Sequence, residues 1–241
     1  MRNQMQTEGV SPSSATFVCS MKFLETPDNG QGVHCEIVKL GLEKETLVGN
    51  TVVDMYAKFV LIVEAEDVLQ SLLTRDVVSW NAMMTGLIEH GYFDETLNCF
   101  EMMELDGIFP DSITFICGLQ ACCSKGAIDR GREMHSWIIK LSLSEIDDPF
   151  GRTLVDMYGK CGLLEEAQKV FDKFRFRSKG SWNAIIAAYA ECEHSEEAIE
   201  CFDRMQEEGA SLDSITIVCV LKASRFSSMV AQGHKYIVNE C

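Results

Sequence analysis

An internal repeat with a period of 102 residues constrains this chain more than any other feature of its sequence. Residues 79–82 (SWNA) recur at 181–184, residues 51–56 (TVVDMY) recur at 153–158 as TLVDMY, and residues 112–114 (SIT) recur at 214–216. All three matches share one offset, which chance does not explain. A period this long that holds several helical hairpins indicates a solenoid built from unequal modules.

Residues 77–111 show the pattern of two short antiparallel helices joined by a tight turn. Apolar side chains recur three or four residues apart, as on one face of a helix, at Trp80, Met83, Met84, Leu87 and Ile88 and then at Leu97, Phe100 and Met103. Gly91 interrupts the run, and Asp94 is placed to cap the second helix. Gly107 can take the left-handed conformation that ends a helix, and Pro110 prevents its resumption. Neither helix is stable alone, so the hairpin requires neighbours.

The repeat divides the whole chain into units of three lengths. We expect long units at 14–45 and 112–147, short units at 46–76 and 148–178, full units at 77–111 and 179–213, the end of a second helix at 1–13, and an incomplete long unit at 214–241. The first long unit is shorter than the second, and the turn-rich stretch 26–29 is expected to absorb the loss. Incomplete units expose apolar faces, so the isolated chain is expected to self-associate.

These units predict an all-α fold, a right-handed α-α superhelix of helix-turn-helix repeats with no strands. No apolar run approaches the roughly 20 residues that a membrane helix needs, so no membrane association is expected. The first residues, MRNQMQ, resemble neither a signal peptide nor an Arg-rich transit peptide. The chain is 46% hydrophobic, enough for a substantial buried interior between neighbouring units.

The net charge of −16 argues against nucleic-acid binding, because phosphate groups attract cations. Nine of the acidic residues, however, lie early in the predicted second helices, where they interact favourably with the positive end of the helix dipole. They are Glu64, Glu66, Asp67, Asp94, Glu95, Glu165, Glu166, Glu196 and Glu197. The surface of the first helices is therefore expected to be much less acidic than the whole chain.

No residue pattern supports catalysis, a metal site or a cofactor. The 11 Cys form no CxxC pair, and Cys99 and Cys201 fall on predicted buried faces, as reduced core thiols do in an intracellular or intra-organellar compartment. His194-Ser195-Glu196 has the HxE form of zinc deaminases, but the downstream PCxxC is absent. The segment 30–32 (GQG) lacks the third glycine and the preceding strand of a dinucleotide loop. We expect no enzyme activity.

Four segments resemble the pentatricopeptide repeat family in its plant PLS subclass of alternating long, short and standard repeats. They are SWNAMM, LVDMYGKCGLLEEAQKVFD, TFICGLQACCSKGAIDRGREMHSWIIK and CFEMMELDGIFPD, and the likeness extends over essentially the whole chain. The resemblance implies a fold like that of tetratricopeptide repeats and sequence-specific binding of single-stranded RNA, not DNA, in a mitochondrion or chloroplast. It implies an adaptor role in cytidine-to-uridine editing, splicing or transcript maturation, with a deaminase or another editing factor acting in trans.

In that family the fifth and last residues of a repeat read one base, and the second residue clamps it. Carried onto this chain, the reading pairs are Asn50 with Asp76, Asn81 with Asp111 and Asn183 with Asp213, a combination that resembles the uracil-preferring one. Leu47 and Val78 occupy the clamping position, which is Gly180 in the last full unit. The unit at 148–178 departs from the pattern with Arg152 and Ser178, and the long units have Val18 and Ile116. The implied target is 5′-UUnnU-3′.

Three alternatives stay open at this point. Trp80 and Trp182 could stack on bases, but their helical spacing favours a place in the core. The Asn–Asp pairs could be solvated polar positions near helix starts. The whole chain could be a protein-interaction scaffold, or a non-functional fragment of a longer repeat protein.

Overall fold

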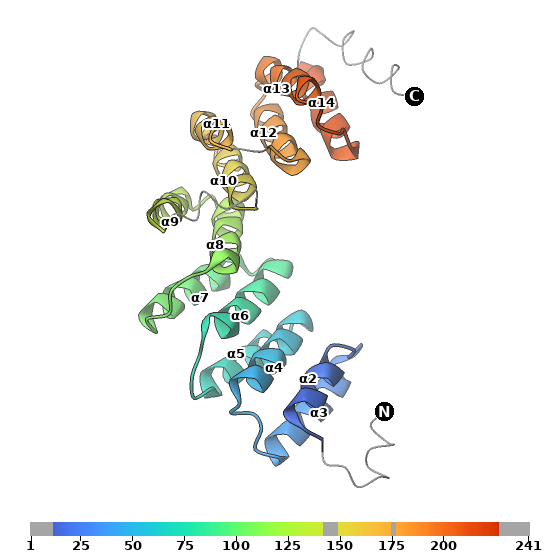
Figure 1. Ribbon diagram of the computed structural model, residues 1–241, viewed down its shortest axis with the longest axis vertical. Helices are drawn as coiled ribbons and strands as arrows, with labels where there is room; N and C mark the ends of the chain where they lie inside the picture. The colour runs from blue at the N-terminus through green and yellow to red at the C-terminus, as the bar shows by residue number, and fades with distance from the viewer. Residues whose placement is uncertain (1–11, 142–148, 175–176, 227–241) are drawn as a thin grey trace. The chain divides into compact units, whose positions relative to one another are not determined.

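The computed structural model describes residues 12–141, 149–174 and 177–226, and this part of the chain is helical without a strand. Its helices are α2 (Ser14–Met21), α3 (Pro27–Lys39), α4 (Thr46–Lys58), α5 (Ile62–Ser71), α6 (Val77–Glu89), α7 (Phe93–Leu105), α8 (Ser112–Lys125), α9 (Ile128–Lys140), α10 (Pro149–Lys160), α11 (Leu164–Asp172), α12 (Lys179–Glu191), α13 (Ser195–Glu207) and α14 (Ser214–Phe226) (Figure 1). They form two compact units, unit 1 (Met1–Cys117) and unit 2 (Gly118–Cys241).

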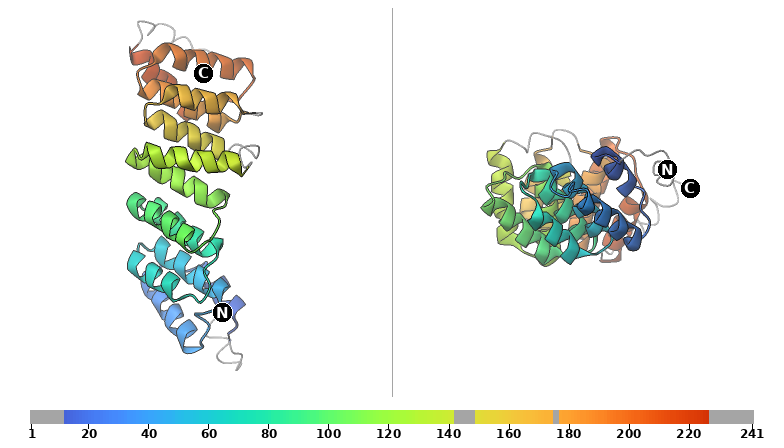
Figure 2. Two further views of the ribbon diagram at one scale, coloured as in Figure 1. Left: turned by 90° about the vertical axis from the view of Figure 1, so that its left-hand side faces the viewer. Right: turned by 90° about the horizontal axis from the view of Figure 1, so that it is seen from below.

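The first helices of successive pairs pack on one another within each unit. In unit 1, α2 contacts α4 and α4 contacts α6, and in unit 2, α10 contacts α12 and α12 contacts α14. The second helices α5, α7, α11 and α13 each pack on the first helix of their own pair, which gives the layers of helices visible in Figure 2. Trp80 and Trp182 are buried in this packing, which confirms their predicted place in the core.

Small residues allow neighbouring first helices to approach closely. A Cβ atom placed on Gly86 of α6 would overlap Ala57 of α4, and one placed on Gly159 of α10 would overlap Ala188 of α12. Backbone atoms of Ala57 lie 3.1 and 3.2 Å from the Cβ position at Gly86. These contacts allow α6 to pack closely against α4, and α12 to pack closely against α10.

The turn predicted inside residues 77–111 is present, with one error about its cap. Gly91 and Gly107 have φ angles of +77° and +72°, the left-handed conformation that glycine adopts without strain. Asp94 was expected to cap α7, but α7 begins at Phe93 and its cap residue is Tyr92, with no side-chain cap bond. Asp94 lies in the first turn, where its charge interacts with the helix dipole.

The expectation for residues 26–29 is also wrong. Thr26 is the cap of α3, its Oγ1 accepts a hydrogen bond from the Asn29 backbone N–H at 3.4 Å, and Pro27 occupies the first turn. This arrangement starts a helix, because proline lacks the N–H that would be left unpaired there. The shortening falls in the first helix instead, since α2 has 8 residues and its counterpart α8 has 14.

Several other expectations concern the polar and reactive side chains. Acidic residues occupy the first turns of α5, α7, α11 and α13, as predicted. Cys201 is buried and Cys99 is half-buried, and the described cysteines are all free thiols. Within the described ranges no helix has the length and apolarity to cross a membrane, and no cluster of His, Cys, Asp or Glu could hold a metal ion. Residues 1–11 and 227–241, parts of the two incomplete units, lie outside the described residues.

Candidate nucleic-acid interface

The three predicted Asn–Asp pairs are each joined by a hydrogen bond. The amide Nδ2 of Asn50, Asn81 and Asn183 donates to Oδ1 of Asp76, Asp111 and Asp213 over 3.2, 2.9 and 3.1 Å, respectively. Each Asn lies in the second turn of a first helix, and each Asp directly precedes the next first helix. Stacking of the first helices therefore brings together side chains that are 26 to 30 residues apart.

Hydrogen bonds keep the three carboxylates ionised. Burial raises the pKa of Asp111, but hydrogen bonds from the backbone of Thr114 and the amide of Asn81 outweigh it, so the pKa lies below its usual value. The pKa of Asp76 is lowered in the same way against burial, by hydrogen bonds from Ser79 and Asn50. The backbone N–H of Thr216 is the largest cause that lowers the pKa of Asp213, to about 2. An ionised carboxylate accepts only, so it must face the NH₂ end of each Asn amide.

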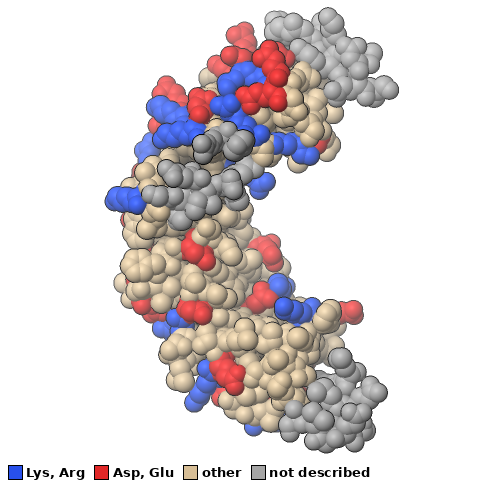
Figure 3. All heavy atoms as spheres, viewed as in Figure 1, with Lys and Arg blue, Asp and Glu red and all other residues tan. Residues whose placement is uncertain are grey.

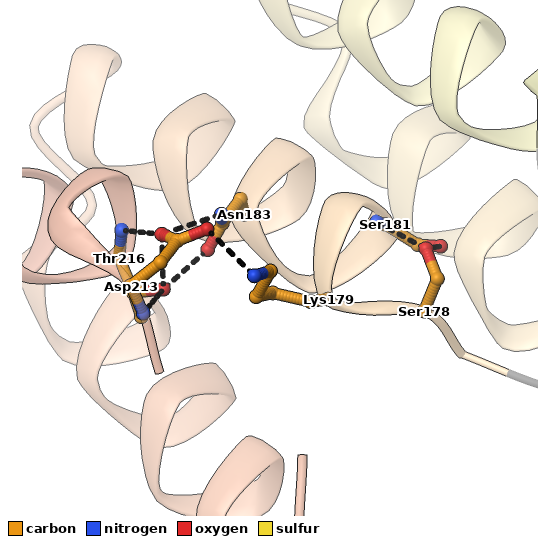
Figure 4. Close-up of polar contacts among 6 residues, drawn as sticks. All are labelled: Ser178, Lys179, Ser181, Asn183, Asp213 and Thr216. Carbon is orange, nitrogen blue, oxygen red and sulfur yellow. Dashed lines mark hydrogen bonds and ion pairs between the residues drawn. The ribbon is translucent and has the colours of Figure 1, made fainter. Parts of the chain in front are cut away.

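A threonine that the sequence analysis did not single out fixes the other end of two amides. The hydroxyl of Thr114 donates to Oδ1 of Asn81 over 2.7 Å, and that of Thr216 donates to Oδ1 of Asn183 over 2.6 Å. Figure 4 shows Asn183, Asp213 and Thr216 converging in this way. The repeated Ser-Ile-Thr at 112–114 and 214–216, directly after each Asp, was the signal for this contact.

Asn50 lacks this second restraint. The equivalent of Thr114 is Ser79, whose Oγ donates to Asp76 Oδ1 over 2.9 Å. Oδ1 of Asn50 is buried and has no hydrogen-bond partner among the described residues. The amide of Asn50 is therefore held at one end only, and less firmly than those of Asn81 and Asn183.

An open groove of about 590 Å³ runs along the first helices of unit 1 beside two of these amides. Its lining includes Asn50, Asn81, Asp111, Leu47, Val78 and Ile113. Leu47 and Val78 are 64% and 56% exposed, which is unusual for large apolar side chains in contact with water. Apolar walls beside oriented hydrogen-bonding groups suit a planar molecule with polar edges.

The remaining repeat positions do not offer an oriented amide. Ser178 caps α12 by accepting from the Ser181 backbone N–H over 3.2 Å, and it makes no pair with Arg152. Val18 and Ile116 are half-buried and carry no hydrogen-bonding group. The sequence prediction that these positions differ from the Asn–Asp pairs thus agrees with their surroundings.

Family models match equivalent stretches of both copies of the 102-residue repeat. The model described as PPR repeat family matches residues 75–124 and 177–224, and the model described as PPR repeat matches residues 152–177. Among curated proteins of Arabidopsis thaliana, the chloroplastic pentatricopeptide repeat-containing protein CRR2 is 36% identical over 208 residues, 86% of this chain and 32% of CRR2. The chloroplastic protein DOT4 is 35% identical over 221 residues, 90% of this chain and 25% of DOT4. A putative pentatricopeptide repeat-containing protein is 33% identical over 240 residues, 96% of this chain and 34% of that relative.

The chain thus spans about a third of the length of the curated relatives that it matches. Among solved structures, it is similar to the maize pentatricopeptide repeat protein PPR10 in complex with an 18-nt psaJ RNA element. The TM-score is 0.81 at 19% identity, over 99% of this chain and 36% of PPR10. This likeness confirms the predicted fold class, an all-α solenoid of helix-turn-helix repeats. The chain belongs to the pentatricopeptide repeat family.

Proposed function

We propose that this chain binds single-stranded RNA in a sequence-specific manner and that Asn50, Asn81 and Asn183 each read a uracil. The observation that carries the proposal is the orientation of the Asn81 and Asn183 amides between an ionised Asp and a Thr hydroxyl. Each of these two amides keeps one N–H and one lone pair on Oδ1 that the contacts above do not use, and the two residues are 6% and 8% exposed. Only the bases of an unpaired strand can turn their Watson–Crick edges toward such a group.

A fixed amide can distinguish uracil from cytosine. Uracil presents an acceptor at O4 beside a donor at N3, and cytosine presents a donor at N4 beside an acceptor at N3. An amide held in one orientation can therefore pair its N–H and its oxygen with uracil. If cytosine takes the same position, donor faces donor and acceptor faces acceptor. A buried polar group left unpaired costs about 1–3 kcal/mol. The apolar side chains of Leu47 and Val78 would hold the base in that position.

The order of the repeats gives the target. The units at 46–76 and 77–111 place Asn50 and Asn81 in succession, two units without an oriented amide follow, and Asn183 comes next. The proposed sequence is 5′-UUnnU-3′. Few bases are read and the chain carries 37 acidic against 21 basic residues, so we expect weak binding.

We further propose that the chain is of the PLS subclass, acts in an organelle, and serves as an adaptor in RNA editing, splicing or transcript maturation. The names of CRR2 and DOT4 place those two relatives in the chloroplast. In editing, a deaminase supplied in trans would carry out the chemistry. A chain that only presents RNA needs no catalytic group of its own.

The test compares wild type and Asn81→Thr for binding to UUnnU and UGnnU oligonucleotides at one salt concentration. Wild type should prefer UUnnU, and Asn81→Thr should shift the preference toward UGnnU, following the family's pattern for Thr with Asp. Asn98→Thr, the same replacement at an exposed position of α7, should behave as wild type. If wild type and Asn81→Thr treat the two RNAs alike, Asn81 reads no base, and the protein-scaffold function becomes the better one.

A further inference from the structure

The start of α12, directly after Ser178 in unit 2, differs in charge from the start of α6 in unit 1. At the positions related by the 102-residue period, Arg152 stands for Asn50, Ser178 for Asp76, Lys179 for Val77 and Gly180 for Val78. The counterpart in unit 1 carries one carboxylate and no cation. The site in unit 2 carries two cations and no carboxylate at these positions. The anionic Asn–Asp pair of unit 1 has thus been replaced by cationic residues.

Gly180 leaves the space that the Arg152 side chain occupies. A Cβ atom on Gly180 would lie 3.2 Å from Cδ and 3.4 Å from Nη1 of Arg152. The first distance is shorter than ordinary van der Waals contact and the second is at its limit, so a side chain at this position would press on Arg152. Arg152 therefore extends across the start of α12, over the position where unit 1 has its exposed apolar clamp.

The guanidinium of Arg152 is available to a ligand. Arg152 is exposed, and among the described residues it has no ion-pair partner within 4 Å, although its charge partly opposes the burial that raises the pKa of Asp156, one turn later in α10. The neighbouring Lys179 lies with Nζ 3.4 Å from Oδ2 of Asp213 and is about half exposed (Figure 4). Ser178 is uncharged, unlike Asp76 at the equivalent position, and its hydroxyl caps α12. On the face shown in Figure 3, Lys and Arg side chains gather over unit 2 together with Asp and Glu side chains, and smaller groups of both charges lie over unit 1.

We propose that Arg152 binds a backbone phosphate of the RNA at the fourth position of UUnnU and reads no base there. The inference rests on the proposed RNA binding. An arginine fork matches the oxygens of a phosphodiester, whereas the oriented amide and carboxylate that discriminate bases are missing here. The unit at 148–178 would then contribute affinity and hold the strand beside the base that Asn183 reads.

The experiment measures binding of wild type, Arg152→Gln and Lys169→Gln to UUnnU oligonucleotides at several salt concentrations, with each base in turn at the fourth position. Lys169→Gln removes the same charge from an exposed site on the second helix α11. Losing one phosphate contact on a single strand lowers the slope of log K against log salt by about 0.7, which is about fivefold in affinity at 0.1 M relative to 1 M salt. Arg152→Gln should show this loss equally for all four bases, and Lys169→Gln should not.

The outcomes separate this inference from the proposed function. A changed base preference at the fourth position with an unchanged salt slope would show that Arg152 reads a base, which overturns the phosphate assignment. Equal affinity and equal salt slope for Arg152→Gln and wild type would also overturn the phosphate assignment. In that case a uracil preference at the other positions would still support the proposed function. If wild type does not bind RNA, both the proposed function and the phosphate assignment are contradicted. Thermal unfolding of the variants checks that each one is folded.

Discussion

Units 1 and 2 make the same close helix contact with the two residues exchanged. In unit 1 the earlier helix contributes Ala57 and the later one Gly86, whereas in unit 2 the earlier helix contributes Gly159 and the later one Ala188. The four positions correspond through the 102-residue period. One glycine and one alanine fit in either order, and two alanines would overlap. The property that both units share is therefore the combined volume at the contact, because helix backbones can approach only where the facing side chains are small.

The Asn amides divide differently, by type of repeat and not by unit. The full repeats at 77–111 and 179–213 hold the amide alike, and the short repeat at 46–76 does not. Asn81 and Asn183 each have an Asp and a Thr partner, whereas Asn50 has the Asp alone. The difference arises from one methyl group and the direction of one hydroxyl. Two positions can thus have the same Asn–Asp pair while one of them holds its amide less firmly.

Exchange of the residues at the helix contact should have the largest effect. Gly86→Ala should destabilise the protein by about 1–3 kcal/mol through overpacking, although alanine alone favours a helix by about 1 kcal/mol over glycine. Adding Ala57→Gly recreates the arrangement of unit 2 and should restore stability to within about 0.5 kcal/mol of wild type. Chemical denaturation monitored by circular dichroism measures both variants. A double variant that is less stable than Gly86→Ala would refute the shared-volume explanation.

Loss of the threonine hydroxyl should change the choice of RNA as well as the stability of the protein. Thr114→Val keeps the shape of a buried side chain but leaves Oδ1 of Asn81 without its donor, a cost of about 1–3 kcal/mol. The freed amide can turn, so discrimination of uracil from cytosine at the second position should fall. Binding of UUnnU and UCnnU oligonucleotides measures it.

Ser79→Ala is the matched control for that prediction. Ser79 makes no hydrogen bond to Asn50, so its loss should change the uracil preference at the first position less than Thr114→Val changes it at the second. Wild type should also discriminate uracil from cytosine less strongly at the first position than at the second. Equal discrimination at both positions would contradict the role given to Thr114.

The smallest effect concerns two histidines that make equivalent contacts. Nδ1 of His34 lies 2.8 Å from the hydroxyl of Tyr56 in unit 1, and Nδ1 of His135 lies 2.8 Å from that of Tyr158 in unit 2. Burial lowers the pKa of both histidines; Glu43 partly opposes it at His34, whereas Lys173 adds to it at His135. We therefore expect the pKa of His135 to be the lower of the two in a titration followed by NMR.

Both histidines should make stability depend on pH in the same direction. Each pKa is lower in the folded state than the unfolded value of about 6.5, so the unfolded chain binds the proton more tightly. The contribution to stability is present above pH 6.5 and is lost as the pH falls toward the folded pKa values. Lys173→Gln should raise the pKa of His135 and leave that of His34 unchanged. An equal shift of both would contradict the local charge effect.

Much of the fold and the site follows from the sequence because it depends on local or periodic features. Gly91 and Gly107 end their helices by a conformation that belongs to glycine itself. The pairing of Asn81 with Asp111 was expected from the family resemblance, and the hydrogen bond between the two side chains is present. Asp94 was assigned wrongly because a cap residue and a first-turn residue differ by only two positions, within the uncertainty of any helix boundary. Thr26 was assigned to a turn because threonine and proline favour both turns and helix starts.

The sequence by itself determined that this chain is an all-α repeat protein of the pentatricopeptide family, and it determined which residues occupy equivalent positions. Only the tertiary structure decided which of those residues meet. The hydroxyl of Thr114 reaches Asn81, and Arg152 extends over Gly180, because stacked first helices bring side chains about 30 residues apart to within contact distance. Periodicity specifies a position on a helix face, but hydrogen-bond direction and van der Waals overlap depend on distances of a few tenths of an ångström. Those distances are set by how closely the helices pack.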